Sequence, residues 1–543
     1  MTASSAFSRI FGARDPGYPI RSDMTPEAEL LEIIASYQRH VDDLAIWSTN
    51  STRVHALLEV ALRPRAESFR RGLEVIDFPW ETLIDLVLEW HYAHPSGDRE
   101  VVDQDVFNAL DLALKFTRIT PLEVAIRTGA YRIRKTGNDF RVHYQWNMAP
   151  EVADLYLERR SSTHETPEPS PAELEWAAKQ DRKQLNKFEP PIALMRRATD
   201  RALTSIKEWQ ASTSEGHLAD DFDLGDGLTV RSMTEVLSVL MAIAQLGELA
   251  HARVRAPGVT LVHAHRSAII DWMKELCSNS TKPAIDVALD RLTAGLGRSV
   301  RRSLLVPNGE IVTFLPLLLF PRAFDSLMLR TAAYNPGTYG PIGQRQGNQA
   351  NVWAKWFSAV SGTQVAERLK VRDATGKVVG DLDVVALDAT TMRGAVFEIK
   401  WPIDAVTLPE TLKIEGNITA AARQLGHVRK LLREGESEVQ LPRGWPAFRD
   451  VEWTWCVGTP RQLTARPLPE PEMTAISMQY LASLGEVDTL TDVLGLLEKP
   501  DWPQAGSHYT VQKTTIELDR HRIHMDSLHL KDVDWLPRVR RSS

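Results

Sequence analysis

Residues 380–387, GDLDVVAL, and residues 395–401, AVFEIKW, decide the fold of the C-terminal half of this chain. Each stretch is apolar, rich in β-branched or aromatic residues, and of a length typical of a buried strand. Each also contains acidic residues, which an apolar strand does not need for packing. Residues 388–393 between them predict a turn, so we expect the two strands to pair as a hairpin.

Alternation along these strands brings charged groups together, because successive residues point to opposite faces of a sheet. In the first strand we expect Leu382, Val384 and Ala386 on one face, and Asp381, Asp383 and Val385 on the other. In the second strand we expect Phe397, Ile399 and Trp401 on one face, and Glu398 and Lys400 on the other. If the strands pair across the turn, two carboxylates and an ammonium group converge.

This predicted cluster suits one kind of chemistry. Two carboxylates side by side repel each other, and buried charges without partners are costly. A hard divalent cation, Mg²⁺ or Mn²⁺, removes that repulsion and prefers oxygen ligands. Such a cation would polarise a phosphodiester oxygen and lower the pKa of an attacking water. Lys400 would orient the water and offset charge that develops on phosphorus.

The segment GDLDVVALD followed by GAVFEIKW resembles the catalytic hairpin of the PD-(D/E)xK, or restriction-endonuclease-like, nuclease superfamily. In that family an acidic residue lies in one strand and a (D/E)xK triplet in the next. The resemblance implies catalytic roles for Asp383, Glu398 and Lys400. It also implies that Asp383, Glu398 and the backbone carbonyl of Ile399 bind the Mg²⁺ or Mn²⁺ ion. It covers about residues 350–458, roughly a fifth of the chain.

The segments around the hairpin agree with the αβββαβ core of that family. We expect a helix at 353–360, strands at 365–371, 378–387 and 395–401, a helix at 417–433 capped by Asn417, and a strand at 451–457. The second helix is expected to bury a stripe consisting of Ile418, Ala421, Leu425, Val428 and Leu432.

Further residues are candidates for supporting roles. Asp381 is a candidate outer ligand or a solvated group at the strand end. Glu367 is the nearest acidic residue before the hairpin, because the preceding helix contains none; it is alternatively an exposed strand residue. Family members often place a Gln or a basic residue on the second helix, facing the site, which implies a catalytic-site role for Gln424; an ordinary boundary glutamine is the alternative. Arg423, Lys430 and Arg433 either contact phosphates or form a solvated helix face.

The rest of the chain gives no resemblance, and we predict a multi-domain α/β protein. The proposed divisions are a helix-rich domain with a small hairpin near 130–146 (1–160), a second helix-rich domain (173–345), the nuclease-like domain (348–460) and an α+β extension (461–543). Polar, proline-rich or glycine-rich connectors at 161–171 and 335–347 separate the first three.

Composition limits the class of protein. The 543 residues are 43% hydrophobic and 25% charged, as in soluble globular proteins. No apolar run approaches the roughly 18–20 residues of a membrane span, and the first residues do not match a secretory signal. Cys277 and Cys456 are too few for a disulfide framework and are expected to be buried. We therefore expect a cytoplasmic protein without a membrane partner. Its net charge of −7 predicts a focused nucleic-acid groove rather than a coating surface.

Other features carry less weight. His263 and His265 form a pair without further ligands at metal-binding spacing, and no nucleotide-binding phosphate loop occurs. Basic clusters at 298–302 and 538–541 are candidates for steering nucleic acid or for solvated tails.

The sequence thus predicts a metal-dependent nuclease with DNA as the preferred substrate. Proteins with this core attached to long unassigned regions often serve in bacterial defence against phage or foreign DNA, which is an analogy. Two alternatives remain: a catalytically silent nuclease-fold scaffold that binds nucleic acid or protein, and an RNA-directed nuclease. A regulatory protein partner is expected to act through the N-terminal half. Oligomeric state and sequence specificity are not predicted.

Overall fold

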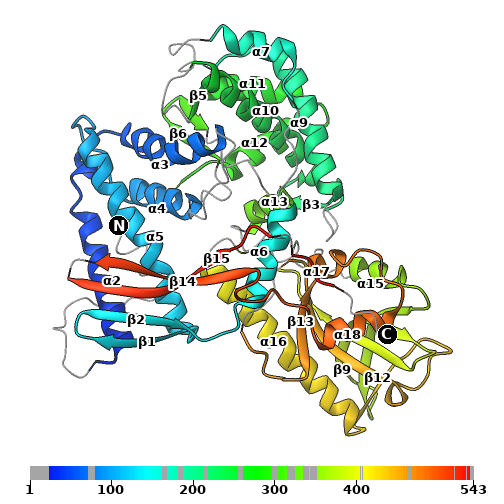
Figure 1. The fold of residues 1–543 in the computed structure, drawn as a ribbon. Helices are drawn as coiled ribbons and strands as arrows, with labels where there is room; N and C mark the ends of the chain where they lie inside the picture. Colours follow the sequence, from blue (N-terminus) through cyan, green and yellow to red (C-terminus); the bar gives the residue numbers. More distant parts are fainter. Residues whose placement is uncertain are drawn as a thin grey trace. The chain divides into compact units, whose positions relative to one another are not determined.

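The computed structural model is a mixed α/β protein with a helix-rich N-terminal region (Figure 1). It describes residues 24–70, 80–161, 168–180, 188–212, 218–254, 261–295, 304–314, 324–333, 342, 351–403, 405, 408–461, 466–518, 520–533 and 535–538. Two compact units emerge. Unit 1 comprises residues 1–123, 164–212 and 217–342, and unit 2 comprises 124–163, 213–216 and 343–543. Each unit is therefore assembled from stretches that are not consecutive in the sequence.

Unit 1 is built mainly from helices. They are α2 (Pro26–Asp42), a 3-10 turn (Ala45–Ser48), α3 (Arg53–Arg70), α4 (Trp80–Ala93), α5 (Asp103–Thr128, whose last turns belong to unit 2), α7 (Pro171–Ala178), α9 (Ile192–Ser212), α10 (Val230–Val254), α11 (Arg266–Leu276), α12 (Lys282–Arg291) and α13 (Phe324–Ala333). Two small sheets accompany them: β3 (Asp223–Gly225) with β4 (Leu228–Thr229), and β5 (Val262–His265), β7 (Ile311–Phe314) and β6 (Leu305–Asn308) in that order.

Local sequence signals explain several of these boundaries. Thr25 caps α2 by accepting a hydrogen bond from the Ala28 backbone N–H, as its position before a proline suggests. Thr281 caps α12, and the helix ends at Arg291 because Thr293 and the residue after it pair with Leu305.

One helical segment, Val230–His251 in α10, is long and apolar enough to cross a membrane. Within the protein, 89% of its most apolar window is buried, as in the core helix of a soluble protein. A single helix of this kind is weak evidence for a membrane span.

Unit 2 contains a four-stranded sheet assembled from distant segments. Its order is β1 (Tyr131–Thr136), β2 (Asp139–Tyr144), β15 (His521–Leu530) and β14 (Tyr509–Leu518). The hairpin predicted near 130–146 is confirmed as β1 and β2. The parallel pairing of β2 with β15, more than two thirds of the chain away, was not predicted. Helix α6 (Ala149–Ser161) follows the hairpin.

A six-stranded mixed sheet forms the larger part of unit 2. Its order is β11 (Ser437–Val439), β8 (Gln364–Asp373), β9 (Val378–Asp388), β10 (Arg393–Ile399), β12 (Glu452–Thr459) and β13 (Met473–Ser477). The strands β8, β9 and β10 are antiparallel, whereas β10, β12 and β13 are parallel. The four strands predicted between 365 and 457 are confirmed, with small differences at their ends.

Helices cover both faces of this sheet (Figure 1). On one face, α15 (Asn351–Ser358) packs with α17 (Met478–Ala482) and α18 (Leu490–Glu498) in what we call the α15 core. On the other, α16 (Leu408–Arg433) forms the α16 core, and its predicted apolar stripe is confirmed. The predicted helix start at Asn417 is wrong. The preceding residues include Pro409 in the first turn and bury Leu412 and Ile414, so they extend the helix to Leu408.

Candidate functional site

The hairpin of β9 and β10 brings the three predicted catalytic side chains together. Its register runs from Arg393 opposite Asp388 to Phe397 opposite Val384. Continued by one step, that register places Glu398 opposite Asp383. The ladder stops there, and an Asp383 carboxylate oxygen accepts a hydrogen bond from the Ile399 backbone N–H at 2.7 Å. Asp383 thus takes the place of a backbone acceptor where the ladder ends.

Glu398 and Lys400 form an ion pair at this point. The Lys400 ammonium donates to a Glu398 carboxylate oxygen at 2.7 Å. The Glu398 side chain is only 5% exposed, whereas that of Lys400 is 35% exposed. The pair therefore links a buried carboxylate to a cation that reaches solvent.

Electrostatics at the site favour a bound cation. Burial, and then the nearby Asp383 carboxylate, raises the pKa of Glu398 to about 7 against the opposing effect of Lys400. Burial also raises the pKa of Asp383, while the Ile399 N–H, Lys400 and Arg368 act in the opposite direction. Both carboxyl groups are thus held in surroundings that disfavour two negative charges, and a divalent cation would stabilise both as carboxylates.

The alternation predicted for the first strand is wrong at one point. Val384 lies in the α15 core, as expected for that face, but Leu382 lies in the α16 core together with Val385. The neighbouring strand β8 changes in the same place, because Ala366 and Leu369, three residues apart, both contact the α16 core. The strand pair therefore rotates locally beside Asp383.

Arg368 accounts for this rotation. It has a backbone φ of 55°, in the left-handed region that residues with a side chain rarely adopt. Pairing continues on both sides of it, with Glu367 opposite Val384 and Leu369 opposite Leu382. Arg368 itself thus falls opposite Asp383, with which it interacts electrostatically. Sequence reasoning missed this residue, because a register shift between Val371 and Arg372 separates it from the turn after β8, and the turn alone would not place Arg368 opposite Asp383.

The supporting candidates lie in different surroundings. Asp381 pairs with Lys370 across β8 and β9 at 3.1 Å, and both side chains are more than 40% exposed. Glu367 is exposed on β8, and Gln424 is exposed on α16 together with Arg423 and Lys430. Asp381 still acts electrostatically on Asp383 and Glu398.

Only a small set of ligands is available for a divalent cation at the predicted site. Within the described part of the chain, no group of three His, Cys, Asp or Glu side chains is placed to hold a metal ion. The cluster at the end of β10 supplies two carboxylates, Asp383 and Glu398. A backbone oxygen and water would have to complete the coordination, and such an all-oxygen, water-rich environment suits Mg²⁺ better than zinc.

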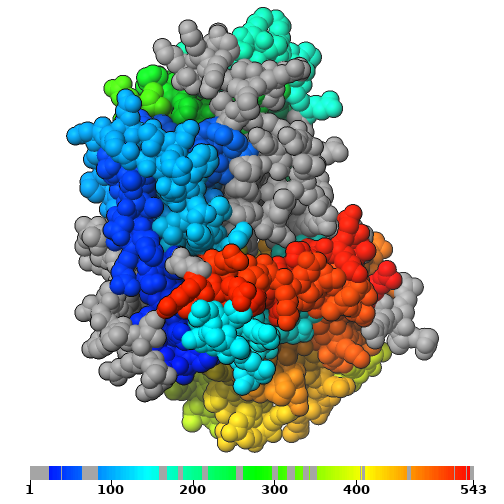
Figure 2. Space-filling view, turned by 60° about the vertical axis from the view of Figure 1, so that its left-hand side comes forward, coloured from blue at the N-terminus to red at the C-terminus, as the bar shows by residue number. Residues whose placement is uncertain are grey.

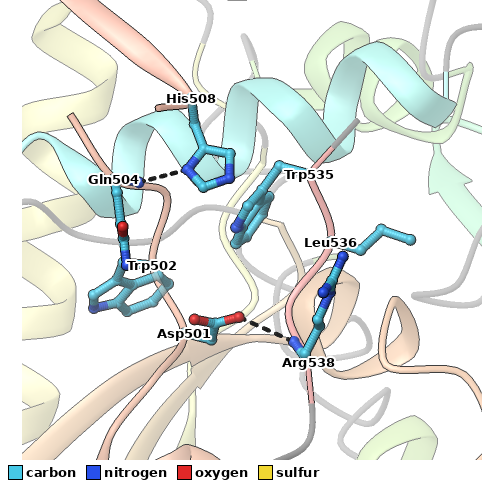
Figure 3. A pocket seen from close by; sticks show the side chains of 7 residues that line it. All are labelled: Asp501, Trp502, Gln504, His508, Trp535, Leu536 and Arg538. Atoms are coloured by element: carbon cyan, nitrogen blue, oxygen red, sulfur yellow. Dashed lines mark hydrogen bonds between the residues drawn. The ribbon is translucent and has the colours of Figure 1, made fainter. Parts of the chain in front are cut away.

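A pocket of about 360 Å³ lies elsewhere in unit 2 (Figure 3). Its lining consists of Asp501, Trp502, Gln504, His508, Trp535, Leu536 and Arg538. The Arg538 backbone N–H donates to the Asp501 carboxylate at 3.2 Å, and His508 Nδ1 accepts from the Gln504 backbone N–H at 2.9 Å. The pocket contains none of the three predicted catalytic residues.

The remaining sequence candidates are placed as follows. His263 lies in β5, where its Nδ1 and the Thr313 hydroxyl are 3.0 Å apart, and His55 Nε2 lies 2.7 Å from the same hydroxyl. Burial lowers the pKa of His263 to about 4, which suits a neutral core residue. Both cysteines are buried, as predicted. The cluster at 298–302 and most of 538–541 lie outside the described residues.

Comparisons with known proteins add no assignment. No protein-family model matches this chain, and neither the curated proteins nor the solved structures contain a significant match.

Proposed function

We propose that this protein is a metal-dependent nuclease of the PD-(D/E)xK type that hydrolyses phosphodiester bonds, with DNA as the preferred substrate. The observation that carries the proposal is the convergence of Asp383, Glu398 and Lys400 where the β9–β10 ladder ends. The chain order α15, β8, β9, β10, α16, β12 supports it, because it follows the αβββαβ order of that family with one short added strand, β11. The helices on opposite faces of the sheet agree with the same core.

The residues present fit a hard cation. Asp383 and Glu398 would hold Mg²⁺ or Mn²⁺ together with the Ile399 carbonyl. When bound, the cation polarises a phosphodiester oxygen and lowers the pKa of an attacking water. Lys400, whose side chain is about one third exposed, stabilises the negative charge that develops on the phosphoryl oxygens. The water oxygen forms a bond to phosphorus and releases a proton to solvent, while the bond to the leaving oxygen breaks and that oxygen takes a proton from solvent.

One observation favours a second candidate. Lys400 already neutralises Glu398 by a close ion pair, an arrangement that a catalytically silent scaffold could keep for its structure alone. The two functions differ in one property, since a scaffold needs no divalent cation.

The test is cleavage of plasmid DNA, single-stranded DNA and RNA by the full-length protein, with Mg²⁺ or Mn²⁺ against EDTA. Asp383→Ala and Lys400→Ala should each reduce the rate at least about a hundredfold. Arg449→Ala removes an exposed cation of the same unit and should leave the rate unchanged.

Titration calorimetry with Mg²⁺ provides an independent measurement. We expect binding by the wild type and its loss in Asp383→Ala. A protein that binds no divalent cation and cuts none of the three substrates would refute the proposal in favour of the scaffold. Cleavage of RNA alone would change the substrate class and leave the site as assigned, because the chemistry at phosphorus is the same.

A further inference from the structure

The four-stranded sheet of unit 2 has one apolar and one charged face. Ile133, Phe140, Val142, Ile516 and Ile523 alternate with polar residues and are buried. The residues between them, where the four strands run side by side, form the opposite face: Arg132, Arg134, Thr136, Asp139, Arg141, His143, Lys513, Thr515, Glu517, Arg522, His524 and Asp526. The C-terminal strands β14 and β15, in red, lie at the surface beside the β1–β2 hairpin, in cyan (Figure 2).

Positive charge is concentrated on the β1–β2 hairpin. Arg134 lies directly opposite Arg141, and Arg132 lies opposite His143. Arg132, Arg134 and Arg141, which we call the arginine patch, are all exposed. Among the described residues, no carboxylate lies within ion-pair distance of any of the three. Like charges opposite each other destabilise a sheet by several tenths of a kcal/mol, so this arrangement opposes folding.

The neighbouring part of the same face is balanced instead. Arg522 donates two hydrogen bonds to Asp139, at 2.9 and 3.0 Å. Lys513 lies directly opposite Asp526. The contrast shows that this sheet can pair its charges, whereas the arginine patch has no ion-pair partner among the residues that the structure describes.

Protection of a sheet edge explains only part of the patch. Edge strands often carry charges that prevent pairing with other chains, and β1 is an edge strand. That role accounts for Arg132 and Arg134. It does not account for Arg141, which lies on the inner strand β2, between β1 and β15.

We propose that the arginine patch binds the phosphate backbone of duplex DNA and holds the substrate of the nuclease site. This inference rests on the proposed function for its choice of DNA. Guanidinium groups match phosphate geometry, and unpaired arginines release counterions when they bind it. Single-stranded nucleic acids are held largely by stacking on aromatic rings. Apart from two histidines, this face carries no ring, which favours a duplex recognised through its phosphates.

The test is fluorescence anisotropy with a short labelled DNA duplex, in EDTA, using full-length Asp383→Ala protein so that nothing is cut. The protein compared with it, the patch variant, carries Arg132→Gln, Arg134→Gln and Arg141→Gln in addition to Asp383→Ala. We expect the slope of log affinity against log salt to fall by about 3, and affinity at about 0.1 M salt to fall at least tenfold. Thermal unfolding should be unchanged or slightly raised, because like-charge repulsion is removed.

A matched control removes the same net charge elsewhere. Arg196→Gln, Lys274→Gln and Lys282→Gln take away three exposed, ion-paired cations of unit 1 and should leave duplex affinity within about twofold.

Equal losses in both triple variants, or an unchanged salt slope in the patch variant, would overturn the inference. So would binding of anionic phospholipid vesicles through the patch without binding of the duplex. If the cleavage assay fails while duplex binding depends on the patch, only the proposed catalytic function falls. If cleavage of DNA is normal with the three arginines replaced and Asp383 intact, only the patch assignment falls.

Discussion

Glu398→Gln should stabilise the metal-free protein above neutral pH, although it removes a buried ion pair. Burial and the Asp383 carboxylate raise the pKa of Glu398 from 4.5 to about 7. Between these two pH values the folded protein keeps a proton that the unfolded chain has released. The free energy of unfolding therefore falls as pH rises through this range, and it stays low above it. A glutamine at 398 carries no charge, so the variant should lack this loss.

The size of the effect follows from the same interval. At about 1.4 kcal/mol for each pH unit, the Glu398 carboxylate destabilises the fold by about 3 kcal/mol at pH 8. The attraction of Lys400 is already included in the raised pKa. Solvent screens little of this effect because the side chain is 5% exposed. For a unit of roughly 250 residues, this corresponds to about 6 °C in Tm.

Thermal unfolding in EDTA, followed by circular dichroism at pH 5 and pH 8, measures the effect. The wild type should lose stability between the two pH values relative to Glu398→Gln. Mg²⁺ at pH 8 should raise the Tm of the wild type but not of the variant. Glu452→Gln, which alters a 74% exposed carboxylate on β12, should behave as the wild type. If Glu398→Gln is the less stable protein at pH 8, the carboxylate repulsion inferred from the structure is wrong.

Three further predictions concern the framework. Arg368→Gly should be about 1 kcal/mol more stable than Arg368→Ala in urea unfolding, because glycine accepts a φ of 55° without strain and alanine does not. If Arg368→Ala is the more stable variant, residue 368 is not strained. Gly394→Ala should lower the free energy of unfolding by at least about 2 kcal/mol, because the new Cβ would lie 2.6 Å from the Ala386 carbonyl oxygen. Gly416→Ala is the control: no neighbouring group lies within 4 Å of its new Cβ, so it should cause no such loss. Arg53→Lys should lower Tm and reduce the free energy of unfolding by at least about 2 kcal/mol. The fully buried guanidinium of Arg53 donates to five backbone carbonyls, and a lysine ammonium group cannot reach all of them. An unchanged Tm would contradict this prediction.

The hairpin and its charges were predictable because strand periodicity is a local property. Apolar residues every second position fixed the strands, and charges within them stood out because packing alone gives no reason for them. Alternation placed Glu398 and Lys400 on one face, and the short turn placed Asp383 next to them. These are the inferences in which neighbours in sequence decide the geometry.

Other features depend on residues far apart in the chain. The pairing of Val142 with Met525 joins segments separated by most of the sequence, and no local signal in either strand names the other. The start of α16 at Leu408 was missed because Asn417 resembles a cap, while burial of Ile414 against the sheet extends the helix past it. Tertiary packing overrides local preference in both cases.

The departure from regular alternation is also what shapes the site. In a continued ladder the Ile399 N–H would bond to a backbone carbonyl, and the side chain at 383 would be free to turn towards solvent. Here the Asp383 carboxylate accepts that bond, which fixes its position relative to Glu398 on the next strand. The left-handed residue Arg368 on the strand beyond rotates the chain at the same level. An irregular backbone at one point of an otherwise regular sheet is stable only if surrounding contacts enforce it. The α15 and α16 cores enforce it from both faces, so the sheet holds two carboxylates together at a place where neither strand alone would put them.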